Sequence, residues 1–329
     1  TLVLFLNSTV NVHRLIVSQR VHFLFRSRIS LIKKEKNAYN QHKKLFAIFL
    51  ISISISAYSQ DDLLDILNEE TPENVTEDIV TATFKGTRIL NGHSIQNRKD
   101  KELEFIISHR FGAINLGFDE LFGLDQSNIR FALEYGVTDN LTMGLGRSSF
   151  EKTFDSFFKY SLVKQRKGAN YFPVAISFFG SIAAKTQDEQ FPLIKRTFSE
   201  NLSYVGQVLI ARKFNSSFSM QLSPTFIHRN TVRVEEDPHS IFALGFGSRI
   251  KLSKRVSLNS EYYLAFDEST SINAKNSLAF GVDIETGGHV FQLILSNAIT
   301  MIEKSFIAEN TGDFFGGDIH FGFNISRTF

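Results

Sequence analysis

From about residue 101 to its last residue, the chain repeats one pattern in which every second side chain is apolar. The final segment, "GGDIHFGFNISRTF", is an example: read backwards from Phe329, one face carries Phe323 and Phe321, with Arg327 as its single charged member. A period of two puts these side chains on one face of a β-strand. Twelve such segments follow one another, with apolar positions over 103–111, 129–135, 141–145, 158–162, 172–178, 204–214, 218–226, 242–250, 256–264, 278–284, 291–295 and 319–329.

The connectors between these segments alternate in length. The short ones are "TDN", "KGAN", "NSS", "SKR" and "GGH", and the longer ones lie near 113–126, 148–153, 185–200, 230–239, 268–276 and 302–317. Outer-membrane barrels combine an even number of strands of about 9 to 11 residues with short turns on one side and long loops on the other. The sequence therefore predicts an all-β fold, an antiparallel transmembrane β-barrel of about twelve strands (range 10–14). Both ends of the barrel then lie on the short-turn, periplasmic side.

Composition agrees with a surface that is apolar at alternate positions. The chain has 34 Phe and no Trp, yet its mean hydropathy is only −0.07. No run approaches the ~18 to 20 continuous apolar residues of a membrane helix. In hydrocarbon an unpaired backbone group costs several kcal/mol, so strands cross a membrane only in a closed barrel. The alternative is a soluble β-sandwich or lipocalin-like barrel, which also alternates but directs its apolar face inward.

The N-terminal part has the pattern of an export signal. Lys43 and Lys44 precede an apolar run over 45–55 and a small-residue site, which predicts a signal peptide over 43–59 cut between Ser59 and Gln60. A buried β-strand is the alternative for this run. Residues 1–42 are then expected to be an upstream, non-native extension, because the first Met of the chain is Met143. Residues 60–100 are predicted to be a periplasmic tether or a plug, and 101–329 the barrel.

The formal charge of +2 depends on this N-terminal part. Nine of the 36 Lys and Arg, but only one of the 34 Asp and Glu, precede residue 60. The remainder of the chain is therefore acidic, and we expect no nucleic-acid partner. The chain has no Cys, which excludes disulfides, thiolate metal sites and a Cys nucleophile.

Residues 102–165 resemble a family of Bacteroidetes outer-membrane β-barrels, the domain of unknown function 5777. The matching motifs are "ISHRFG" (107–112), "FGLD" (122–125), "ALEYGVTDNL" (132–141) and "GRSS" (146–149), and "FKGTRILNGHS" (84–94) belongs with them. The resemblance extends over about 84–329. It implies an outer-membrane barrel made as a secreted precursor. No activity is established for this family, so the resemblance transfers no catalytic residues.

Charged residues at the polar positions of the strands are the candidates for a functional site, because they are expected to face the lumen. Two interpretations remain open: a paired network that fills a narrow barrel, or a lined pore that selects small polar solutes. The twelve candidates are Glu104, Arg110, Arg130, Glu134, Asp155, Lys159, Lys213, Arg249, Lys251, Glu261, Asp283 and Glu285.

Catalytic, metal and cofactor sites are not indicated. Ser108 and His109 carry the residue types of an outer-membrane lipase, but adjacent strand residues point to opposite faces and cannot form a nucleophile–base pair. His228 and His320 add no spacing signal, and the other histidines of "GHS" and "GGH" lie in turns. The stretch "GFDELFGLD" predicts a short helix in the first long loop.

These observations predict a narrow, porin-like channel for small solutes and not an enzyme. A non-conducting structural or accessory barrel of an envelope or secretion complex is one alternative, and a lipid hydrolase is the other. The expected partners are outer-membrane lipid and lipopolysaccharide, the barrel-assembly machinery through the strand ending at Phe329, and an envelope protein. No cofactor and no metal are expected.

Overall fold

The protein is described here from a computed structural model, which describes residues 78–187, 196–267, 269–286 and 289–329. The predicted upstream extension, the signal peptide with its cleavage point, and residues 60–77 lie outside the described residues.

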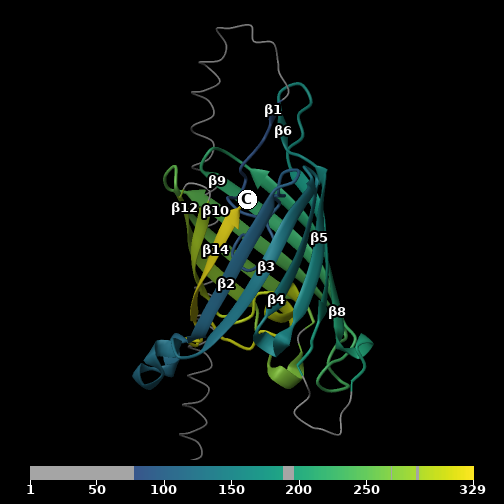
Figure 1. Cartoon of the computed structure of the whole chain (residues 1–329), viewed down its shortest axis with the longest axis vertical. Coiled ribbons are helices and arrows are strands. Elements are labelled where there is room, and N and C mark those ends of the chain that lie inside the picture. Colours follow the sequence, from purple (N-terminus) through teal and green to yellow (C-terminus); the bar gives the residue numbers. More distant parts are fainter. Residues whose placement is uncertain (1–77, 188–195, 268, 287–288) are drawn as a thin grey trace, which may run out of the picture. The chain divides into compact units, whose positions relative to one another are not determined.

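Twelve antiparallel strands of the described residues form one closed barrel (Figure 1). Each strand pairs with the barrel strand before it in the chain, and β14 pairs with β2 to close the sheet. The predicted fold class and strand number are therefore confirmed. The strands are β2 (Leu103–Ala113), β3 (Ser127–Thr138), β4 (Leu141–Ser148), β5 (Phe154–Val163), β7 (Ala175–Ala184), β8 (Leu202–Lys213), β9 (Phe218–Arg229), β10 (Ser240–Lys251), β11 (Val256–Ala265), β12 (Ser277–Thr286), β13 (His289–Ser296) and β14 (His320–Thr328).

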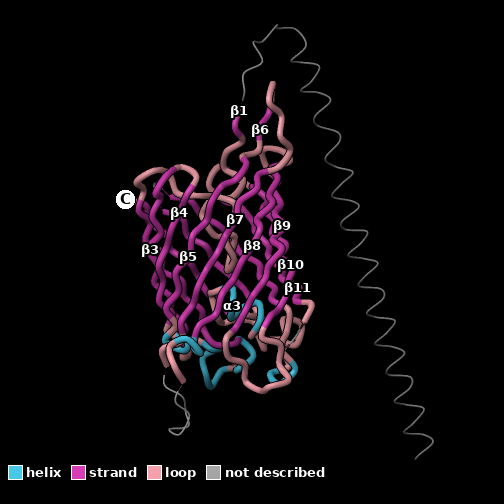
Figure 2. Tube along the Cα trace, turned by 90° about the vertical axis from the view of Figure 1, so that its right-hand side faces the viewer, coloured by secondary structure: helices cyan, strands magenta, loops and turns pink. Residues whose placement is uncertain are grey.

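The two ends of the barrel meet at the short-turn side. The backbone N–H of Phe329 donates to the carbonyl of Leu103 at 2.8 Å, and the N–H of Leu103 donates back at 3.4 Å. A second, two-stranded sheet pairs β1 (Asp78–Ile79) with β6 (Arg166–Lys167) at this side (Figure 2). The predicted parity, with both barrel ends beside the short turns, follows from the twelve antiparallel pairings.

One connector differs from its predicted form. The sequence pattern placed a short "KGAN" turn before a strand that begins near Phe172, whereas β7 begins at Ala175 and the connector contains β6. The backbone of Phe172 bonds to that of Arg166 in both directions, at 3.0 and 3.2 Å. Phe172 continues the alternation of the strand, but its backbone hydrogen bonds are made to Arg166 within the connector and not to a neighbouring barrel strand.

Side chains alternate across the barrel wall. In β10, Phe242 and Leu244 are exposed on the outside while Ala243 between them is buried. Outer aromatic rings of neighbouring strands also pack together, as Phe226 and Phe242 do with ring centroids 5.0 Å apart. The outer face is therefore apolar, as the period of two predicted.

The inner face is less polar than the sequence pattern suggested. Several inward positions carry large apolar side chains that belong to one buried cluster. These residues pack against Ile89 and Leu90 of the segment before β2 and against Phe306 and Ile307 of helix α3 (Glu303–Ala308). The inward apolar residues of the wall are Phe157, Phe179, Val205, Leu209, Ile227, Ile241, Tyr263 and Ile294.

The long loops carry short helical elements. The helix expected in the first long loop is present only as short 3₁₀ turns, η2, interrupted by a kink because Leu121 and Phe122 have positive φ; Phe118 is 78% exposed. None of the helices within the described ranges is long and apolar enough to span a membrane. The 3₁₀ elements are η1 (Ile114–Leu116), η2 (Phe118–Gly123), η3 (Phe150–Lys152), η4 (Ser199–Asn201) and η5 (Thr270–Ile272).

Helix α3 in the last long loop was not predicted, and it lies inside the barrel near the long-loop end (Figure 2). It contacts β8 and β11, and the ring of Phe306 meets that of Tyr263 edge to face with centroids 5.2 Å apart. The loop therefore turns inward and covers the lumen.

We predict that Phe306→Ala detaches this loop from the barrel. The side chain is 0% exposed, and truncation of a buried Phe costs about 3–5 kcal/mol. Amide exchange over 297–319 should accelerate strongly while exchange in the strands stays slow. Phe315→Ala is the matched control in the same loop, since that side chain is 91% exposed. Equal exchange in the two variants would contradict the prediction.

Candidate functional site in the lumen

The segment that precedes β2 enters the barrel and returns as a hairpin. We call residues 81–98 the luminal segment. The N–H of Ile89 donates to the carbonyl of Gly92 at 2.9 Å, and the N–H of Ser94 donates to the carbonyl of Thr87 at 2.8 Å. Residues 87–95 are buried, so the tip of the hairpin lies deep inside the barrel.

The wall binds the backbone of this hairpin with polar side chains. The Glu261 carboxylate accepts from the N–H groups of Leu90 and Gly92, at 3.2 and 3.0 Å. Nearby strands β13 and β14 supply donors: Gln292 donates to the Ile89 carbonyl and Asn324 to the Leu90 carbonyl, both at 2.9 Å. The wall and the hairpin's own bonds, Ile89 to Gly92 and Arg88 to Asn91, thus pair the backbone of the tip, as a buried turn requires.

Further from the tip, side chains of the wall donate hydrogen bonds to both arms of the hairpin. Lys159 donates to the Ser94 carbonyl at 3.0 Å, and Gln221 donates to the His93 carbonyl at 2.8 Å. On the other strand, Arg249 donates to the Ala82 carbonyl at 3.0 Å. The backbone is therefore held along most of its buried length.

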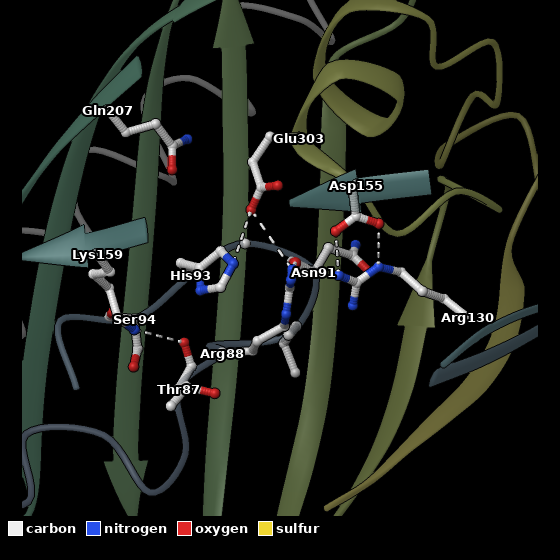
Figure 3. A network of polar contacts seen from close by, with 12 residues as sticks. Thr87, Arg88, Asn91, His93, Ser94, Arg130, Asp155, Lys159, Gln207 and Glu303 are labelled. Atoms are coloured by element: carbon white, nitrogen blue, oxygen red, sulfur yellow. Dashed lines mark hydrogen bonds and ion pairs between the residues drawn. The ribbon is translucent and has the colours of Figure 1, made fainter. Parts of the chain in front are cut away.

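Side chains of the luminal segment add contacts to acidic side chains. Arg88 lies 4.0 Å from Glu134 on β3 and 3.6 Å from Glu303 on α3, and Nε2 of His93 lies 4.0 Å from the same Glu303 oxygen (Figure 3). These separations exceed hydrogen-bond length, so the contacts are loose. They link the hairpin, the wall and α3 in one polar group.

Eight of the twelve predicted lumen-lining residues contact the luminal segment. Besides the residues already described, Glu104 lies 3.4 Å from Arg98, Arg110 donates to the Asn91 side chain at 2.8 Å, and Glu285 pairs with Lys85. Lys213 donates to the Thr81 carbonyl at 2.8 Å. The eight are Glu104, Arg110, Glu134, Lys159, Lys213, Arg249, Glu261 and Glu285.

The remaining four have other surroundings. Arg130 and Asp155 form a bidentate pair on the inner wall, with distances of 2.9 and 2.5 Å (Figure 3). Asp283 accepts a hydrogen bond from Gln292 at 2.9 Å, and Gln292 in turn binds the hairpin. Lys251 is half-buried at the short-turn end of β10.

Sequence reasoning missed the hairpin's own polar residues and the helix that meets them. Arg88, Asn91, His93 and Glu303 lie in segments without strand periodicity, so no alternation marked them. The amide residues of the wall do stand at inward positions of the pattern. A search for every polar inward residue, rather than for charges alone, would have found them.

The hairpin leaves little free space beside the wall. A cavity between Gly86, Thr87, Gln292 and Asn324 measures about 20 Å³. That volume suits about one water molecule. The gap between hairpin and wall at this point is therefore too small for a larger solute.

The residues considered for hydrolysis do not form a catalytic pair. Ser108 is buried on the inner face, whereas the ring of His109 lies on the outer face and stacks on Phe323 with centroids 5.1 Å apart. Across the part of the chain that the structure describes, no group of three or more His, Cys, Asp and Glu is arranged to hold a metal ion.

A cluster of ion pairs holds α3 against neighbouring loops at the long-loop end of the barrel. Lys304 lies 3.3 Å from Glu151 and 2.7 Å from Glu309, and Lys185 lies 3.3 Å from Glu151. Glu309 also lies 3.5 Å from Arg229 at the end of β9. The cluster joins the last loop to the loops that follow β4 and β7 and to the end of β9.

These contacts shift the pKa values of both partners. Burial raises the pKa of Glu151, but the ammonium groups of Lys304 and Lys185 outweigh burial and bring it below its ordinary value. Burial lowers the pKa of Lys304, but the carboxylates of Glu309 and Glu151 outweigh burial and bring it above its ordinary value. Both groups are therefore charged at neutral pH.

A family model described as a membrane-bound β-barrel domain (DUF5777) matches residues 84–329, which confirms the family predicted from the sequence motifs. Among solved structures, the NanC porin is similar at 7% identity, with 69% of this chain and 98% of that chain covered and a TM-score of 0.43. Omp33 of Acinetobacter baumannii follows at 9% identity, with 71% and 100% covered and a TM-score of 0.36. None of the curated proteins matches the chain. The structural likenesses are distant, and the family match alone carries the assignment.

We predict that acid releases the last loop. A carboxyl whose pKa is lowered by folding stabilises the fold above its unfolded value, here 4.5, and loses that contribution as the pH falls through its folded value. The raised pKa of Lys304 preserves its contribution up to about 10.5 and loses it only above. A fluorophore on Phe315→Cys should show falling anisotropy below about pH 4.5.

The variant that tests the cause is Glu151→Gln, which should show low anisotropy at pH 7 and little change on acidification. Glu120→Gln is the matched control, because Glu120 is an exposed acid in a different long loop. A wild-type acid response that persists in Glu151→Gln would show that another group controls the loop.

Proposed function

This chain belongs to the family of membrane-bound β-barrel domains of unknown function 5777, and on that premise we propose that it is an outer-membrane channel for small polar solutes, closed at rest by its luminal segment. The observation that carries the proposal is the set of wall side chains that bind the backbone of the hairpin tip. These contacts close the lumen without covalent bonds.

The hairpin contacts are of a kind that water can replace. A hydrogen bond within a protein contributes only about 0.5–1.5 kcal/mol net, because water takes over the donor and acceptor when it breaks. Glu261, Gln292 and Asn324 would keep their hydrogen bonds to water if the hairpin left. The wall can therefore bind either the hairpin or water in its place.

The hairpin also enters and leaves by the same end. Thr81 is bound by Lys213 at the end of β8, and Asn97 donates to the carbonyl of Asn140 in the β3–β4 turn at 2.7 Å. Both positions are at the short-turn side. A hairpin held in this way can withdraw toward that side without threading the barrel.

Withdrawal would leave inward side chains of both charges along the lumen. Glu104, Glu134 and Lys159 would then face water rather than the hairpin. Inward side chains of opposite charge in a narrow barrel favour small polar solutes over large or apolar ones. Export through the predicted signal peptide, and assembly through the strand ending at Phe329, are part of the same proposal.

The second candidate, a non-conducting accessory barrel, is favoured by a different observation. Ile89 and Leu90 pack in the apolar cluster with Tyr263 and Phe306, and water does not replace those contacts. The two candidates differ in whether the hairpin ever leaves the lumen.

Displacing the hairpin tip tests the proposal. A Cβ at Gly92 would overlap the Tyr263 hydroxyl, so Gly92→Leu should push the tip away from the wall. In planar bilayers we expect the open probability to rise about tenfold, which corresponds to ~1.4 kcal/mol. Gly206→Leu is the matched control, since a Cβ at Gly206 has open space around it.

A disulfide supplies the opposite change. The chain has no Cys, and Asn91 donates to Ser296 at 3.2 Å, so Asn91→Cys with Ser296→Cys should lock the tip to β13. The oxidised barrel should be silent, and reductant should restore openings. A Gly92→Leu barrel that is folded, as judged by heat-modifiable mobility on gels, yet never conducts would refute the channel and support the accessory barrel.

A further inference from the structure

A groove on the outer face of the barrel is unrelated to the lumen. It measures about 540 Å³, and its lining residues lie mainly on β3, β4, β5 and β7. Phe131, Leu145, Phe154 and Ile182 line it. In a membrane-bound barrel this surface faces lipid, so the groove is a depression within the lipid-facing band.

The strand register explains the depression. On one rung of outward side chains, Leu145 is opposite Ser156, and Ser156 is opposite Ile182. On the next rung toward the long loops, Phe154 is opposite Ala184. Ser156 and Ala184 are thus two small residues between large ones. The groove lies over them.

The positively charged side chain of Arg147 lies at one end of the groove. Arg147 is opposite Phe154 at the long-loop end of β4, it is exposed, and its guanidinium lies 5.5 Å from the Phe154 ring centroid. Within the described ranges, no carboxylate pairs with it. Asp155 also borders the groove, but its carboxylate is bound by Arg130 from the inside.

We propose that Arg147 and this groove form a binding site for one lipid with a net-negative, phosphate-bearing headgroup. The headgroup contacts Arg147 at the membrane interface, and one acyl chain lies over Ser156 and Ala184. Two features specify the occupant: the groove is continuous with the lipid-facing band, and the Arg147 guanidinium, which has no carboxylate partner among the described residues, is complementary to an anionic headgroup.

Tryptophan fluorescence tests this site, because the chain has no Trp. The L145W reporter lies in the groove, where Leu145 is 64% exposed, and the L258W reporter lies on the outer face of β11, where Leu258 is 41% exposed. The full chain is reconstituted in phosphatidylcholine with a rising share of dibrominated phosphatidylglycerol. We expect the brominated anionic lipid to be preferred over brominated phosphatidylcholine about fivefold at L145W and not at L258W.

Two further variants separate the site from general attraction to charge. R147Q in the L145W background should abolish the preference. R212Q should preserve it, because Arg212 also stacks on an outer ring, Phe214 at 5.0 Å, but lies at the short-turn end away from the groove. Equal preference at the two reporters, or a preference that survives R147Q, would overturn the proposal.

Discussion

The structure depends on the pairing of backbone N–H and C=O groups where water is absent. In the membrane this requirement is met only when the last strand bonds to the first, and β14 does so along its length with β2. Inside the barrel the same requirement recurs for the luminal segment, whose turn has few bonds of its own. There the side chains of the wall supply the partners, Glu261 as an acceptor and Asn324 as a donor.

The barrel could be predicted from the sequence because its two surroundings differ so sharply. A strand with lipid outside and a polar lumen inside must alternate, and the alternation reveals both the strand and its register. The prediction went wrong at Phe172, where the alternation continues past the end of the sheet pairing. Periodicity reports which way a side chain would point, but it does not report which backbone groups are paired.

The contents of the lumen were much harder to predict. Phe157 and Phe179 occupy inward positions, and nothing in their local sequence distinguishes a side chain that packs on an inner hairpin from one that faces water. Helix α3 and the luminal segment are short and lack a period of their own, so their positions are set by contacts with distant strands. The charged candidates were found because an ionised side chain within the lipid-facing band is costly, whereas the outward Arg147 and Arg212 lie at strand ends.

The side chains that hold the hairpin tip come from strands made much later than the tip itself. Asn324 lies 234 positions beyond Leu90 along the chain, and Gln292 lies 203 beyond Ile89. The receptacle for the tip is therefore built from β11, β13 and β14 together, and it is complete only when these strands have joined the sheet.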